Sequence, residues 1–131
     1  MLLNHLSNSN KEDFIELAYK MAYSNKDFPD VQQRLLSHYK EECDISIIPN
    51  TATTDELLAH FSRQSDEVKK IVYYEIYMLL ISDGKIDTAE QQSLEKMRSA
   101  LNIPVEDAVK IQEQCALIKQ ANLDLQKLLG L

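Results

Sequence analysis

The amino-acid sequence predicts an all-α fold in a single domain. Only two glycines and three prolines occur in 131 residues, so few residues suit the tight turns of a β protein. Apolar residues instead recur at spacings of three and four along most of the chain, which is the period of a helix that buries one face. A chain of this length can bury a core that is stable without disulfides or a structural metal.

The composition of the chain excludes several classes of binding partner. The net charge is -7, and no Lys/Arg cluster is present to bind a phosphate backbone, so we expect no nucleic-acid partner. This acidity either serves solubility alone or marks a surface for a cation or a basic protein patch. Cys43 and Cys115 lie far apart with no histidine at metal-ligand spacing, which argues against a zinc site or a disulfide framework. No apolar run is long enough for a membrane span and no signal peptide is evident, so we expect a cytoplasmic protein without membrane insertion.

The first two helices follow from capping signals and apolar spacing. The capping box Ser9-x-x-Glu12, in which two side chains bond otherwise unpaired N–H groups, opens a helix over Lys11 to Tyr23. Pro29 suits the first position of a second helix that ends near Glu42. The faces expected to point inward are Phe14, Leu17, Ala18 and Met21 on the first helix, and Val31, Leu35, Leu36 and Tyr39 on the second.

A connector and a short third helix follow. The apolar run from Cys43 to Pro49 is expected to be an extended connector packed against the bundle, and the alternative is a short strand. A second capping box, Thr53-x-x-Glu56, opens a helix that ends near Arg63. Its inward residues are expected to be Leu57, Leu58 and Phe61.

The fourth helix is expected to be the buried centre of the fold. Ser65 caps it, and from Asp66 to Ile81 it is apolar around most of its circumference. A third capping box, Asp87-x-x-Glu90, then opens a helix over Thr88 to Leu101. The other helices are therefore expected to pack around the fourth helix.

The C-terminal segment is expected to contain two helices. Pro104 begins one that runs from Val105 to about Gln120. Asn122 is expected to cap a last short helix that ends near Leu129, before a glycine that stops it.

The chain also contains a weak internal repeat. A shift of 58 residues lays Ser24 on Ser82, Phe28 on Ile86 and Leu36 on Leu94, and the order of helix, polar turn, helix and apolar exit recurs. This pattern predicts a duplicated helix hairpin, with copies over residues 11–45 and 66–103, each covering the apolar face of the other.

The second copy carries a recognisable motif. It consists of Ile81-Ser82-Asp83-Gly84-Lys85-Ile86-Asp87-Thr88-Ala89-Glu90, followed by Leu94, Met97, Leu101, Ile103 and Pro104. Over about residues 10–120 the chain resembles the TerB-like family, which includes the tellurite resistance protein TerB and the helical domain of a DnaJ-like co-chaperone. The resemblance implies a compact bundle of about seven helices built from two pseudo-symmetric hairpins, with a role in tellurite resistance or stress responses within membrane-linked assemblies. The first copy departs from the family pattern, because residues 25–28 lack the repeated Asp-Gly.

The acidic turn is a candidate divalent-cation site. Asp83, Asp87 and Glu90 are the candidate ligands, and Asp27 and Asp30 join them if the repeat brings the two loops together. The turn is not an EF-hand, because the first ligand positions of such a loop would fall on Leu79 and Ile81. The alternative is purely structural, with Gly84 making a left-handed turn and the two carboxylates forming the cap.

No catalytic constellation is evident. His5, His38 and His60 are scattered, and two isolated glycines cannot build a phosphate-binding loop, so we expect neither enzymatic activity nor an organic cofactor. We therefore expect an interaction or adaptor module with protein partners, and the alternative is a module that responds to calcium or a similar cation through the acidic turn. The C-terminal leucines either fold back on the bundle or form a homodimer; they are Leu123, Leu125, Leu128, Leu129 and Leu131.

Overall fold

The structure is a computed structural model that describes residues 2–23, 30–82, 84 and 86–131. In these residues the chain is helical and contains no strand, which confirms the all-α prediction. The elements in chain order are η1 (Leu3–His5), α1 (Asn8–Tyr23), α2 (Asp30–Glu42), α3 (Thr54–Ser62), α4 (Asp66–Leu80), α5 (Thr88–Ala100) and α6 (Val105–Leu128).

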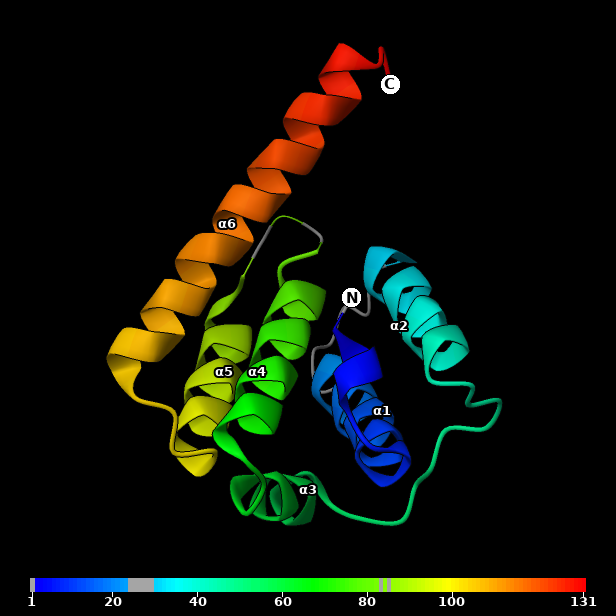
Figure 1. The fold of residues 1–131 in the computed structure, drawn as a ribbon, viewed down its shortest axis with the longest axis vertical. Coiled ribbons are helices and arrows are strands. Elements are labelled where there is room, and N and C mark those ends of the chain that lie inside the picture. Colours follow the sequence, from blue (N-terminus) through cyan, green and yellow to red (C-terminus); the bar gives the residue numbers. More distant parts are fainter. Residues whose placement is uncertain (1, 24–29, 83, 85) are drawn as a thin grey trace.

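Helix α4 is the centre of the fold, as the sequence predicted. It contacts α1, α2, α3, α5 and α6 (Figure 1). Its residues Val72, Ile76 and Leu79 are wholly buried, because the helix is apolar on most sides and these three residues face the surrounding helices. The helices α1 and α2 are in contact with each other, as are α4 and α5, and α3 packs against α1, α4 and α5.

The predicted inner face of α1 is buried in full. Phe14 on this face meets Tyr39 of α2 edge to face, with the ring centroids 5.4 Å apart. The Tyr39 hydroxyl donates to the backbone carbonyl of Glu75 on α4 at 3.0 Å, so one aromatic side chain joins α2 to the central helix. On α2, Leu36 is also buried, whereas Val31 is 38% exposed, contrary to the prediction, because the neighbouring Gln32 is the residue of the first turn that points into the fold.

The helix caps agree with the sequence in two of three capping boxes. The side chains of Thr53 and Asp87 each accept a hydrogen bond from the backbone N–H three residues later. The glutamate side chain of each box accepts in turn from the backbone N–H of the capping residue. The box predicted at Ser9 is wrong. Helix α1 begins at Asn8, and Ser7 Oγ accepts from the Asn10 N–H at 3.1 Å, so Ser9 lies inside the first turn.

The C-terminal segment differs from the prediction. Residues expected to form two helices form the single helix α6, and Asn122 lies in its interior rather than at a cap. No glycine or proline occurs between Pro104 and Gly130, and an interior asparagine costs a helix only about 0.7 kcal/mol. The described residues therefore contain six α-helices, not the seven that the resemblance implies.

The segment between α2 and α3 is an irregular connector, as expected. Ile45 and Ile48 are half-buried against the core, while Ile47 is 82% exposed. The buried carboxylate of Glu16 on α1 holds the end of this connector, since its Oε1 accepts from the Thr51 N–H at 2.8 Å and its Oε2 from the Ala52 N–H at 3.1 Å. This long-range contact has no local signal in the sequence.

Candidate functional site

The acidic turn is built as a helix cap in the residues that the structure describes. Asp87 Oδ1 accepts from the Glu90 N–H at 2.7 Å, and Glu90 Oε1 accepts from the Asp87 N–H at 3.4 Å. Asp87 is exposed, whereas Glu90 is buried at the start of α5. Gly84 has a φ of +84°, the left-handed conformation expected of it. Asp83, the third candidate ligand, lies outside the described residues.

A lysine supplies a positive charge at the same turn. Lys119 on α6 donates from Nζ to the Ile81 carbonyl at 2.9 Å, at the C-terminal end of α4 where a cation is favoured. Asp30 is exposed, and Asp27 lies outside the described residues. Within the described part of the chain, no group of three or more His, Cys, Asp or Glu side chains is arranged to hold a metal ion. The cation site therefore stays a prediction.

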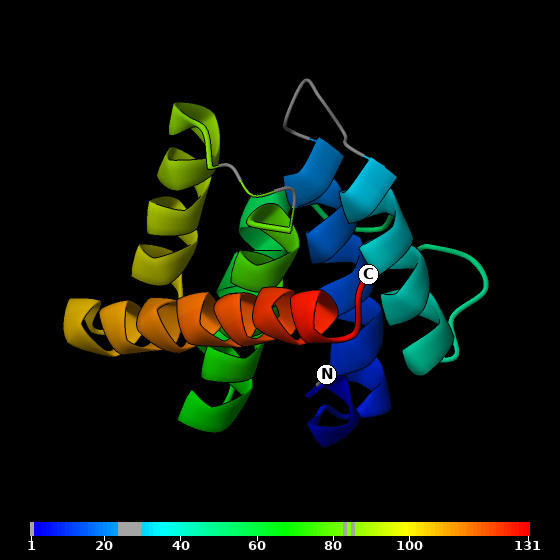
Figure 2. The ribbon, with the colours of Figure 1, turned by 90° about the horizontal axis from the view of Figure 1, so that it is seen from above.

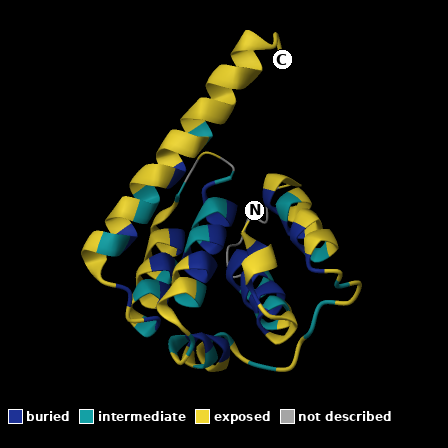
Figure 3. Cartoon of the chain, in the orientation of Figure 1, coloured by how far each residue is buried: buried dark blue, intermediate teal, exposed yellow. Residues whose placement is uncertain are grey.

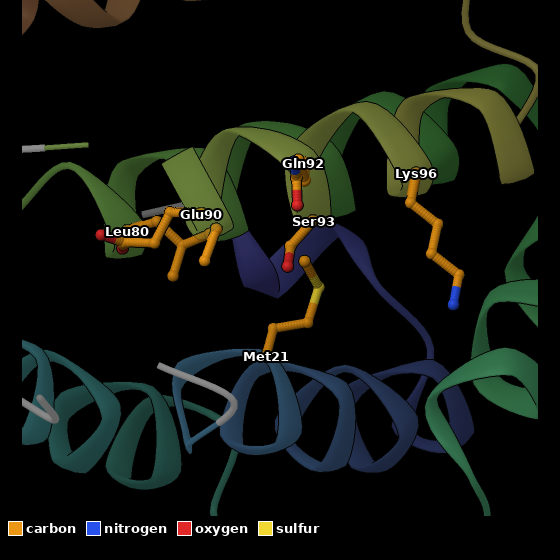
Figure 4. Close-up of a pocket in the computed structure, with 7 residues that line it drawn as sticks. Met21, Leu80, Glu90, Gln92, Ser93 and Lys96 are labelled. Atoms are coloured by element: carbon orange, nitrogen blue, oxygen red, sulfur yellow. The ribbon is translucent and has the colours of Figure 1, made fainter. Parts of the chain in front are cut away.

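A shallow pocket lies between α1 and α5, beside the acidic turn (Figure 4). Met21 reaches from α1 toward Ser93 of α5, and Glu90 and Lys96 contribute the charged groups of the wall. The Lys96 ammonium pairs with Asp55 at 2.9 Å.

One histidine belongs to a polar cluster that sequence spacing did not reveal. His60 Nε2 on α3 lies 3.1 Å from Asp13 Oδ2 and 3.2 Å from Asn10 Oδ1, both on α1. Burial raises the pKa of the Asp13 carboxyl, and the neighbouring His60 opposes that increase. Asn10 also donates to Gln64 at 3.3 Å, so the cluster ties α3 to α1. It joins residues about 50 positions apart, which is why local motifs missed it.

The two halves of helix α6 have different environments. In the first half Ala108 and Cys115 are buried, and Gln112 donates to the Tyr73 hydroxyl of α4 at 2.7 Å. From residue 120 onward every residue is exposed (Figure 3). Figure 1 shows α6 rising past the upper ends of α4 and α5, and in Figure 2 it runs from the α5 side toward the α1 side.

The exposed end of the chain is rich in leucine. We call residues 117–131 the α6 tail. Its exposed apolar residues are Leu117, Ile118, Leu123, Leu125, Leu128, Leu129 and Leu131. The expected alternative in which these leucines fold back on the bundle is therefore wrong, because one continuous helix carries them away from the core.

A groove between α4 and α6 leads onto the tail. It encloses about 320 Å³ between the side chains of Leu2, Lys70, Ile71, Tyr74, Lys110, Ile111 and Gln114, and its walls are almost wholly apolar. Ile111 and Gln114 begin a stripe with alternating spacings of three and four, which stays on one side of a helix. We call this stripe the α6 flank; it consists of Ile111, Gln114, Ile118, Ala121, Leu125 and Leu128.

The function of the chain has to be inferred from the fold and from the α6 flank with its groove, because comparisons with known proteins give no match. Within the described residues, no helix combines the length and apolar character that crossing a bilayer requires. Protein-family models, curated proteins and solved structures give no match to this chain.

Proposed function

We propose that the chain is a non-enzymatic interaction module that binds a protein partner through the α6 flank. The observation that carries the proposal is the α6 tail, in which Leu125 and Leu128 are 52% and 84% exposed on a helix that projects from the folded body. Large contiguous apolar patches on a soluble domain mark sites of interaction. A helix with apolar residues at these spacings is a common recognition element between proteins.

The rest of the molecule supports a binding role. The groove beside the flank is apolar, with Lys70 and Lys110 contributing side chains to its wall. A pocket of this kind accepts an apolar side chain more readily than a polar metabolite. The groove and tail together offer one continuous surface instead of an isolated cavity.

The biological setting that we propose follows from the TerB-like resemblance. The motif at residues 81–90 and the adjacent pairs α1–α2 and α4–α5 support it. On this proposal the two pairs descend from one duplicated hairpin, and the module acts in stress or tellurite resistance. Loss of the gene should then lower survival in tellurite, and wild-type survival in the deletion strain would contradict this setting.

Photo-crosslinking in the producing cell tests the binding surface. A photoreactive phenylalanine analogue at Leu128 should give crosslinked protein adducts, because this position is on the flank. The matched control places the same group at Gln120, which is also exposed on α6 but faces away from the flank. Adducts from position 128 and none from position 120 would support the proposal; equal adducts, or none at either, would contradict it.

A further inference from the structure

The α6 flank has a groove and a ridge on the same side of one helix. In its first half, Ile111 and Gln114 form one wall of the groove, and Tyr74 of α4 belongs to the other. In its second half, Leu125 and Leu128 stand clear of the body. A two-fold axis through the middle of such a flank places each ridge in the groove of the other copy, so the surface is self-complementary.

We propose that the partner of the α6 flank is a second copy of this chain, an inference that rests on the proposed function. The two α6 helices lie antiparallel along their flanks, and the tail of each copy fills the α4–α6 groove of the other. The contact extends over residues 111–128, a length of about 27 Å. The register pairs Ile111 with Leu128, Gln114 with Leu125, and Ile118 with Ala121 of the second copy.

The spacing of the flank fits pairing between helices. Its residues alternate at spacings of three and four from Ile111 to Leu128, which keeps them along the seam of two packed helices. Leu117 and Leu129 lie beside this row, and both are exposed. Covering the flank and groove in two copies removes on the order of 1,000 Å² of surface, the size of a weak interface that dissociates on dilution.

Charge favours contact through the tails. Two copies with a net charge of -7 each repel one another through their acidic bodies. The segment 114–131, in contrast, carries only Lys119, Asp124 and Lys127, and none of these belongs to the flank. The groove adds Lys110 and also Lys70, whose ammonium pairs with Asp107 at 3.4 Å. Antiparallel pairing therefore joins the least acidic part of each chain and leaves the bodies at opposite ends.

Pairing also explains how the tail keeps its helical form. Residues 117–128 form three turns of α6 with little support from the body. Helical segments of fewer than about 12–15 residues are marginal in water without tertiary packing. The groove and tail of a second copy supply that packing.

The mass of the purified full chain in solution tests the pairing. Analytical ultracentrifugation should give twice the chain mass of 15.1 kDa. Leu125→Glu should give the single-chain mass, because it places a charge in the seam. The matched control, Leu123→Glu, introduces the same charge two residues away on nearly the opposite side of the helix, and should keep the double mass. Cooperative urea unfolding of both variants would show that the body of each still folds.

Disulfide formation tests the antiparallel register. A mixture of Gln114→Cys and Leu125→Cys chains should form a linked dimer on mild oxidation, because the two positions face each other across the seam. Neither variant alone should link, since its two new cysteines would be about 16 Å apart along the helix axis. The native Cys43 and Cys115 are buried, and wild-type protein provides the control for them.

These outcomes separate the pairing from the broader proposal. A single-chain mass for the wild type at high concentration would overturn the pairing, as would equal masses for the two glutamate variants. Linking by Leu125→Cys alone would overturn the antiparallel arrangement. If the chain is monomeric while the photoreactive group at Leu128 still captures a different protein, the pairing fails and the interaction module stands.

Discussion

At the scale of single residues, two buried glutamates have opposite electrostatic environments. Glu16 accepts three hydrogen bonds from Thr51 and Ala52, and these outweigh the effect of burial, so the pKa of Glu16 lies below its usual value. Burial dominates at Glu75 on α4, where the Leu2 N–H is a distant donor at 3.4 Å, and the pKa of this carboxyl is raised. The two residues therefore give stability opposite dependences on pH.

The lowered pKa of Glu16 predicts a loss of stability in acid. Its stabilising effect is present above the unfolded-state pKa near 4.5 and is lost as the pH falls through the lower folded-state pKa. Glu16→Gln should cost about 1–3 kcal/mol at neutral pH, because an amide nitrogen cannot accept the Ala52 N–H. Urea unfolding should show this difference shrinking as the pH falls below about 4.5. Glu12→Gln, an exposed change on the same helix, is the control; equal losses in both variants would count against the assignment.

The raised pKa of Glu75 predicts the opposite slope. Its contribution is complete below the unfolded-state pKa near 4.5 and declines as the pH rises through the higher folded-state pKa. Within that window the wild type should lose up to about 1.4 kcal/mol per pH unit through this one group. Glu75→Gln should remove this slope in urea unfolding measured between pH 4.5 and 7. Parallel pH profiles for variant and wild type would show that Glu75 titrates normally.

At the scale of secondary-structure elements, the acidic turn forms the N-terminal cap of α5. Whether it also binds a cation is a question for experiment. Asp87 accepts a hydrogen bond from the Glu90 N–H in the first turn of α5. The cap and the cation site respond differently to one substitution, because asparagine is as good a cap as aspartate but carries no charge. Asp87 therefore provides a direct comparison of the two roles.

Two changes at Asp87 distinguish these roles. As a cap, Asp87→Asn should leave the free energy of unfolding unchanged, while Asp87→Ala should cost about 1 kcal/mol. For a cation site, calcium titration followed by two-dimensional NMR should show saturable shifts of the Gly84 and Glu90 amides that both variants weaken. Flat amides in the wild type would remove the cation-responsive alternative.

The sequence predicted most elements because their signals are local. Capping boxes at Thr53 and Asp87 need only a few neighbouring residues, and the apolar character of α4 is visible along one segment. Ser9 and Asn122 misled because a capping residue type also occurs inside helices, where tertiary context and helix continuity decide. The Glu16 contact and the groove join distant segments, so no local pattern contains them.

At the scale of the whole molecule, buried and exposed leucines should contribute very differently to stability. Leu79 on α4 is wholly buried, so Leu79→Ala should cost about 2–5 kcal/mol. Leu128→Ala makes the same chemical change on the α6 tail and should cost less than about 0.5 kcal/mol in dilute protein, where the chain is single. Urea unfolding at low concentration measures both. A large loss at Leu128 under these conditions would show that the tail packs on its own body.

The candidate binding surface could also be recognised only from the arrangement of the whole molecule. The sequence indicated that the C-terminal leucines either fold back or form a dimer, but it could not decide whether the body covers them. That choice depends on the direction of α6 relative to α4, which is set by packing around Cys115 and the Gln112–Tyr73 hydrogen bond. An unbroken helix then determines that the tail projects.

Hydrogen exchange of the backbone amides at residues 121–128, measured over a range of protein concentrations, tests the role of the α6 tail most directly. We expect these amides to be protected in concentrated protein and to exchange rapidly on dilution or in Leu125→Glu, while residues 108–115 stay protected throughout. Protection of the tail that is equal at every concentration and unchanged in Leu125→Glu would show instead that the chain covers its own leucines, and would contradict the binding surface.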